Sequence, residues 1–346
     1  MKRIIIILAA ILCTTNMMAQ EQADTVVITL QNGTQVRYTS KQFDRVQIIA
    51  NLRWGVKVYL KNGKSKDYLA TKVEVLEYAG GGTNVTRNIN RNLYRAKLLE
   101  YPHLAADSTQ NQLIIKSTED YGITFSLEWS YADKANRWTC YQMHSGNTVV
   151  NVDRVDAFQE DPEIPEEYRS KLKDYRNSGF SRGHLCPSAD RLCSAEQNEQ
   201  TFFLSNMQPQ YQNHNGGLWL RLENKIRDWA SDCDTLYVVK AATIRSDQLL
   251  DVKCNNTLIV PKYFYMAVLA YDKSTDTYQA MGLWTLHQEA TDSNKNLGDY
   301  AITIDELEER TGIDFFCNLP DVKEDEVEST LDLDYWNITV TPPPEE

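Results

Sequence analysis

The chain has 346 residues, of which 42% are hydrophobic and 24% are charged. This is the composition of an ordinary globular protein, and the length is sufficient for more than one folded domain. The formal net charge of −12 at pH 7 excludes broad electrostatic adhesion to nucleic acid. It does not exclude a local positive site, because a metal ion and a few arginines can form one within an acidic surface.

Residues 1–19 have the three parts of an export signal in the expected order. Two basic residues precede an apolar run over residues 4–12, and Ala19 offers a small residue for cleavage before Gln20. The run is too short to span a bilayer. We therefore expect a periplasmic or secreted mature chain without a transmembrane segment. Lipid attachment at Cys13 is the less favoured alternative, because the residue before it fits such a site poorly.

Six cysteines follow the signal. An even number in an oxidising compartment permits disulfides, with fifteen complete pairings. Buried free thiols are the alternative, above all for Cys140, which lies in the apolar run over residues 138–143. There is no CxxC pair, so a zinc site is not expected. The six are Cys140, Cys186, Cys193, Cys233, Cys254 and Cys317.

Residues 24–78 are predicted to form a separate small unit that contains a repeat. Leu30-Gln31-Asn32-Gly33 recurs at an offset of 30 as Leu60-Lys61-Asn62-Gly63. Asn-Gly between alternating strand-like runs is a strong hairpin signal. We expect two hairpin repeats, each closed by a third strand and packed as one small sheet domain. Nothing catalytic is visible there, and an envelope or protein partner, a spacer role and a folding role all stay open.

A triple glycine at residues 80–82 lies in a polar linker over residues 79–97, and the larger domain is predicted over residues 98–340. Thr303 and Glu306 indicate the start of a helix that ends at Gly312. The acidic segment 321–334 is expected to be solvated surface. The strands expected in this domain are residues 113–116, 123–129, 138–143, 236–242, 256–260, 264–271 and 278–285.

A polar stretch in the middle of this domain carries the candidate chemistry. His184 follows directly after Arg182 and Gly183, and Gly179 lies just before them. The glycines let the backbone bend and a ligand come close. Arginine is a forked, permanently charged donor suited to phosphate, and histidine is the side chain best suited to accept a proton near neutral pH. The segment therefore predicts a base beside a phosphate-binding group.

A helix is predicted to begin at Asn215. Apolar residues recur at helical spacing as far as Ile226, with Trp219 and Leu220 widening the apolar face. Trp219 is therefore expected in the core rather than as a platform for bases. Glu223 lies eight residues after Asn215, about 80° round the helix. An amide oxygen and a carboxylate on one side of a helix are hard ligands suited to magnesium or its bound waters.

These motifs resemble those of the DNA/RNA non-specific endonucleases, whose core is a ββα-metal (His-Me) finger. The family pattern is Asp-Arg-Gly-His with a proline three residues later, then Asn-x-x-Pro-Gln, Asn, Trp and Leu-Glu. The resemblance runs from residue 98 to residue 338, with Ser181 in place of the usual Asp and Ala241-Ala242 in place of a glycine-containing strand end. The matching residues are Arg182, Gly183, His184, Pro187, Asn206, Pro209, Gln210, Asn215, Trp219, Leu222 and Glu223.

The resemblance implies an α+β fold in which a hairpin and the following helix carry the site, preceded here by the small all-β repeat domain. It implies that His184 takes a proton from the attacking water. Asn215 would hold Mg²⁺, with Mn²⁺ as a substitute, and Glu223 would orient metal-bound water as a catalytic residue. No other metal or organic cofactor is expected.

Three further residues complete the implied site. Arg182 and Arg154 would bind phosphate oxygens, and Asn206 would support the site by hydrogen bonding. The implied substrates are DNA and RNA without sequence preference, and the implied products carry 5′-phosphate ends.

Several alternatives remain. The chain could be an exported binding protein on a catalytically silent nuclease fold, or a phosphodiesterase that acts on an ester other than nucleic acid. His214 is the alternative base, which we disfavour because it lacks the Arg-Gly flank. Cys186, two residues after His184, is a disfavoured alternative nucleophile.

Overall fold

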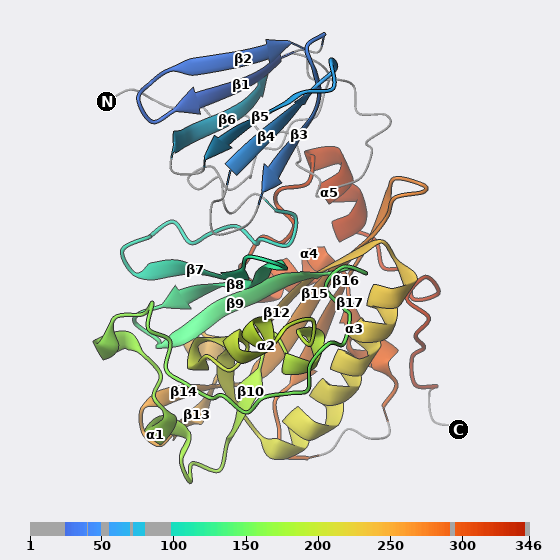
Figure 1. Cartoon of the computed structure of the whole chain (residues 1–346). Coiled ribbons are helices and arrows are strands. Elements are labelled where there is room, and N and C mark those ends of the chain that lie inside the picture. The colour runs from blue at the N-terminus through green and yellow to red at the C-terminus, as the bar shows by residue number, and fades with distance from the viewer. Residues whose placement is uncertain are drawn as a thin grey trace. The chain divides into compact units, whose positions relative to one another are not determined.

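The computed structural model describes residues 25–39, 41–49, 55–69, 72–79, 98–290 and 295–342 (Figure 1). The chain divides into two compact units. One contains the chain up to Leu104 together with Phe316–Glu326, and the other contains Ala105–Phe315 and Val327–Glu346. The predicted export signal and residues 80–97 of the predicted linker lie outside the described residues. No helix in the described ranges is both long and apolar enough to cross a membrane.

The first unit contains two three-stranded sheets, with strand orders β2-β1-β6 and β3-β4-β5. Both Asn-Gly turns form as predicted, with Gly33 at a φ of 80° and Gly63 at 81°. Glycine adopts this left-handed region without a steric cost. The strands are β1 (Thr25–Leu30), β2 (Gln35–Thr39), β3 (Phe43–Ile49), β4 (Gly55–Leu60), β5 (Ser65–Leu69) and β6 (Val73–Ala79).

The prediction that each repeat is closed by its own third strand was wrong, because the third strand of each repeat pairs with the hairpin of the other repeat. β6 pairs with β1, and β3 pairs with β4. Alternation along a strand indicates which face is buried but not which strand is its neighbour, so the sequence pattern left this exchange open. Both hairpins contribute to one core, formed by Val26, Ile28, Tyr38, Val56, Val58 and Val73.

The second unit is built on a seven-stranded antiparallel sheet with the order β17-β16-β15-β12-β9-β8-β7. Six of the seven predicted strands lie in this sheet. The sheet strands are β7 (Asn111–Thr118), β8 (Gly122–Ser130), β9 (Ala135–Met143), β12 (Thr235–Ala242), β15 (Tyr263–Asp272), β16 (Thr277–Leu286) and β17 (Ala301–Ile302).

The seventh predicted strand belongs to a separate hairpin. There β14 (Leu258–Pro261) pairs with β13 (Leu249–Cys254). The strand begins later than residue 256 because Asn255 and Asn256 take positive φ in the turn between the two strands. The combination of an antiparallel sheet with separate helices confirms the predicted α+β class.

Helix α3 (Leu220–Asp232) covers one face of the sheet (Figure 1). Its apolar side chains pack into the main core, which also contains buried side chains from six strands of the sheet. This packing explains why a helix with many charged residues is held firmly, since only one face needs to be apolar. Residues in this contact include Leu222, Ile226 and Trp229 from the helix, and Leu127, Tyr141, Val238, Met266 and Met281 from the sheet.

The chain enters α3 through a π-helical segment, η6 (His214–Trp219). Hydrogen bonds in such a segment join residues that are five positions apart, so angles predicted from the 3.6-residue period do not hold across it. Trp219 is fully buried, which confirms its predicted place in the core. Leu220 is 42% exposed, so its predicted place on the apolar face was wrong.

The predicted helix over residues 304–311 is confirmed as α4 (Ile304–Thr311). The Thr303 hydroxyl accepts a hydrogen bond from the backbone N–H of Glu306 at 3.1 Å, and Gly312 ends the helix in the left-handed conformation. The remaining helical elements are η3 (Glu166–Tyr168), α1 (Leu172–Tyr175), η4 (Ser188–Asp190), α2 (Ala195–Gln200), η5 (Leu204–Asn206), η7 (Ser246–Gln248), η8 (Leu297–Tyr300) and α5 (Asp321–Glu328).

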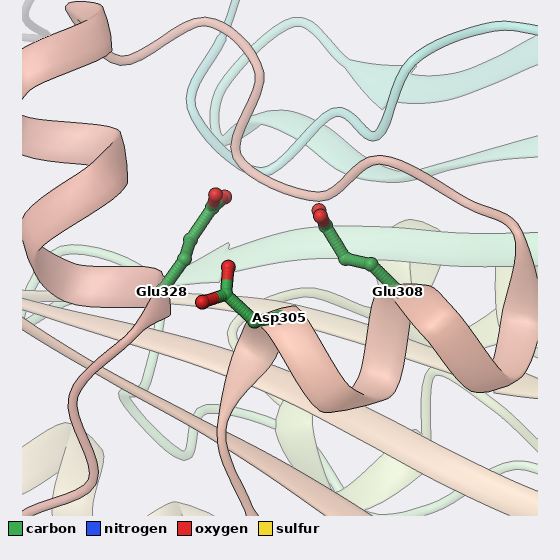
Figure 2. A group of neighbouring side chains, drawn as sticks. All are labelled: Asp305, Glu308 and Glu328. Carbon is green, nitrogen blue, oxygen red and sulfur yellow. The ribbon is translucent and has the colours of Figure 1, made fainter.

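The acidic segment 321–334 is not simply solvated surface as predicted, because it contains α5 and buried carboxyl groups. Glu328 is only 7% exposed. Figure 2 shows Glu328 extending into the same region as Asp305 and Glu308 of α4, and one carboxylate oxygen of each lies within 4.8 Å of the others. Burial, followed by the charges of Asp314 and Asp305, raises the pKa of Glu308 to about 8.

This shift predicts how stability depends on pH. Glu308 has a folded pKa above its ordinary value of 4.5, so the stability it contributes is complete below that value and is lost as pH rises through 8. We expect Glu308→Gln to stabilise the protein by about 1–3 kcal/mol near pH 9 and to have little effect near pH 4. Urea unfolding at both pH values measures this, with the exposed Glu309→Gln as control. An equal effect at both pH values would contradict the assignment.

Candidate active site

A two-stranded hairpin precedes the π-helical segment and α3. In it, β10 (Ser181–His184) pairs antiparallel with β11 (Met207–Gln210). A Cβ atom at Gly183 would lie 2.0 Å from the Gln210 Oε1 atom and 2.9 Å from its Cβ atom, so a larger residue would force the buried Gln210 to shift. The glycine of the Arg-Gly-His segment is therefore favoured by the close packing of the two strands.

Five of the six predicted site residues line one cavity of about 890 Å³. Arg182 and His184 come from β10, and Arg154 comes from the irregular chain that follows β9. Asn215 comes from η6 and Glu223 from the first turns of α3. The hairpin and the helix thus bring together residues that are far apart in the sequence.

His184 is a buried, neutral histidine with one ring nitrogen left without a partner in the described structure. Its ring lies against the rings of Phe158 and Phe202, at centroid distances of 5.7 Å and 5.1 Å. Burial, assisted by the charges of Arg154 and Arg182, lowers the pKa of His184 to about 3. The imidazole is therefore neutral near pH 7. Its Nε2 atom is buried and has no hydrogen-bond partner among the described residues, so it is available to accept a proton.

Asn206 does not line the cavity. It is fully buried, and its side chain holds the loop that follows His184. Its amide nitrogen donates to the carbonyl oxygens of Cys186 at 2.8 Å and Thr201 at 2.9 Å, and its Oδ1 atom accepts from the Cys186 N–H at 2.9 Å. This geometry agrees with the supporting role by hydrogen bonding that the resemblance implies. Asn206 is a positioning residue.

Arg182 and Arg154 are both available to bind an anion. The Arg182 guanidinium lies 3.7 Å from the centroid of Phe158 and forms no ion pair within the described chain. Arg154 pairs with the exposed carboxylate of Asp156 at 3.1 Å. Exposed pairs of this kind contribute little free energy, so a phosphate can replace Asp156.

Asn215 and Glu223 fit a hard divalent cation. Both line the cavity, and the Asn215 side chain has no hydrogen-bond partner in the described structure. Burial raises the pKa of Glu223 to about 7, even though the charge of Lys240 acts in the opposite direction. A cation beside this carboxyl would favour its ionised form. Amide and carboxylate oxygens are also the ligand types that Mg²⁺ prefers.

Sequence analysis missed a group of charges at this site. The buried Asp190 carboxylate accepts hydrogen bonds from Arg227 at 2.7 Å and from the Tyr141 hydroxyl at 2.8 Å, and it lies 4.0 Å from the Lys240 amine. Arg227 also lines the cavity. Arg227 could have been identified from the sequence, because it lies four residues after Glu223 and therefore on the same helix face. Lys240, a charged residue within the apolar strand predicted over residues 236–242, was a weaker indication of these buried charges.

The alternative base and nucleophile do not fit this site. His214 does not line the cavity, and its ring nitrogens contact Gln210 Nε2 at 2.6 Å and Thr285 Oγ1 at 3.2 Å. These contacts make it a structural residue. Burial raises the pKa of Cys186 to about 12, which makes a thiolate scarce near neutral pH. In the described chain, all six cysteines are free thiols.

Comparison with known proteins agrees with this geometry. The family model for DNA/RNA non-specific endonucleases matches residues 106–322. The chain is 31% identical to a nuclease of Syncephalastrum racemosum, over 56% of this chain and 66% of that protein. It is 28% identical to the mitochondrial nuclease EXOG of Xenopus laevis, over 57% of this chain. The match spans only 58% of the length of that relative.

The fold also resembles that of a solved structure. A chain in the crystal structure of the EndoG/EndoGI complex superposes with a TM-score of 0.52 and 22% identity, over 60% of this chain and 88% of that chain. At this identity the likeness concerns the fold alone. The family model, in contrast, matches well over half of the chain and includes every residue that lines the cavity. The chain therefore belongs to the DNA/RNA non-specific endonuclease family.

Proposed function

We propose that this protein is a metal-dependent endonuclease that hydrolyses phosphodiester bonds in DNA and RNA. The observation that carries the proposal is the buried, neutral His184, whose Nε2 atom has no partner in the described structure. It lies in a cavity that also holds phosphate-binding arginines and two oxygen ligands. A base, cations and a metal site in one cavity are the parts that phosphodiester hydrolysis requires.

The proposed roles follow from these positions. His184 takes a proton from the water that attacks phosphorus, and the 3′-oxygen leaves, so that the product carries a 5′-phosphate. Arg182 and Arg154 bind phosphate oxygens, where they stabilise the charge of the transition state. Asn215 would hold Mg²⁺, which would supply positive charge to the transition state. Glu223 would orient water bound to that ion.

The charge of the cavity supports a nucleic acid substrate. Its lining contains five basic residues and only one carboxylate, although the whole chain carries a formal charge of −12. Contacts between arginines and phosphates do not depend on base sequence, and they support cleavage without sequence preference.

The first test of the proposal is digestion of plasmid DNA and of RNA by the mature protein. We expect cleavage of both substrates in the presence of Mg²⁺ and none after chelation with EDTA. Mn²⁺ should restore activity as a substitute. Release of 5′-phosphate ends should be detected by labelling after phosphatase treatment. Failure to cleave either nucleic acid with Mg²⁺ or Mn²⁺ would rule out the proposed function.

A second test separates the base from the metal ligand. His184→Ala should lower the rate by about 10²–10⁴-fold while Mg²⁺ dependence stays normal. Asn215→Ala should lower the rate by weakening metal binding, so that added Mg²⁺ recovers part of it. Mg²⁺ titrations of the rate compare both variants, with Asn213→Ala, outside the cavity, as control. Recovery of His184→Ala rather than Asn215→Ala by Mg²⁺ would reverse the proposed roles.

We also propose that the protein is exported, on the basis of its N-terminal sequence alone. The mature chain is then expected to begin at Gln20 and to lie outside the cytoplasm. Mass analysis of the N-terminus of the native protein tests this expectation. An intact Met1 would contradict export, and a lipid on Cys13 would indicate a membrane-anchored protein instead.

A further inference from the structure

The cavity extends beyond the residues that one phosphate requires. Its lining continues from Arg182 to α1 and the turn after it, and includes Lys173, Arg176 and Phe180. A volume of about 890 Å³ is near the upper end of the range for sites that hold a whole small molecule, about 300–1,000 Å³. The part of the cavity beside α1 therefore has room for a second chemical group of the substrate.

Two positive charges in this part of the cavity have no counter-ion. Lys173 and Arg176 are exposed, and neither forms an ion pair within the described chain. In contrast, the nearby Lys171 pairs with Glu166 at 3.2 Å. Unpaired cations that line a cavity of an acidic protein favour an anionic ligand. Together with Arg182, they extend the positive lining away from His184.

The backbone that carries these cations is held in place by the β13–β14 hairpin. The Asn255 amide donates to the carbonyl oxygens of Lys173 at 3.1 Å and Arg176 at 2.7 Å. The Cys254 thiol donates to the Asp174 carbonyl at 3.1 Å. The backbone of both residues is therefore ordered before a ligand binds. Less backbone conformational entropy is then lost on binding.

An aromatic ring completes this part of the cavity. Phe180 is half-buried, lines the cavity and lies against the Tyr211 ring, with a centroid distance of 4.9 Å. The neighbouring ring holds Phe180 in place. A partly exposed aromatic ring in a cavity lined by cations can bind a nucleotide, because the ring stacks on the base and a cation pairs with the phosphate.

We propose that Lys173, Arg176 and Phe180 form a subsite for the nucleotide next to the scissile phosphate. The two cations hold the adjoining phosphodiester group, and the Phe180 ring stacks on the base. This inference rests on the proposed function and specifies its substrate: a polynucleotide with at least two phosphodiester groups and a base that can leave its stack. Stacking and phosphate contacts are both tolerant of base sequence.

The experiment compares two substrates that differ only in having this neighbouring nucleotide. One is a single-stranded oligonucleotide, and the other is bis(4-nitrophenyl) phosphate, a single diester. For Lys173→Gln/Arg176→Gln we expect a higher KM for the oligonucleotide, unchanged kcat, and a slope of log KM against log salt that is smaller by about 1–2. Phe180→Leu should raise this KM about tenfold. Cleavage of the single diester should not change in either variant.

The control is Lys225→Gln/Lys253→Gln, which removes the same charge outside the cavity. Circular dichroism checks that every variant is folded. The inference is overturned if the oligonucleotide KM and the salt slope of the cavity variant equal those of the control, or if both substrates are affected alike. A wild-type protein that cleaves neither substrate overturns the proposed function instead, and the subsite with it.

Discussion

The indole of Trp219 joins the elements that carry the site. It is fully buried, its ring lies 5.3 Å from the ring of Phe264 in the central sheet, and its Nε1 atom donates to the backbone oxygen of His184 at 3.3 Å. It also lies midway along the chain between Asn215 and Glu223. One side chain therefore contacts the helix, the sheet and the hairpin together, and the distance between His184 and the proposed metal ligands depends on this contact.

Electrostatics place a second constraint on the site. Burying a charge is costly unless it has a partner, and the buried Asp190 has Arg227, Tyr141 and Lys240 around it. The charges of Lys240 and Arg227 also act on Glu223, where they oppose the burial that raises its pKa to about 7. The acidic protein thus keeps a cavity with a positive lining. A lining of this kind favours a polyanionic ligand at the cavity rather than over the whole surface.

Local patterns in the sequence predicted the hairpin turns, α4 with its cap, most strands, and the identity of five cavity residues. These features were predictable because each depends on residues that lie close together in the sequence. Features that depend on distant residues were missed: the exchange of β3 and β6 between sheets, the pairing of Asp190 with Arg227, and the buried Lys240. The π-helical segment was also missed, because an ideal helical period cannot show a local change of hydrogen bonding.

A crystal structure of His184→Ala with Mg²⁺ and an uncleaved oligonucleotide would test the central claim most directly, namely that one cavity holds both the metal ion and the scissile phosphate. The account predicts Mg²⁺ on the Asn215 side-chain oxygen, and the scissile phosphate beside Arg182 within reach of the missing imidazole. Nucleic acid bound outside this cavity, or a metal ion held by residues other than Asn215, would contradict it.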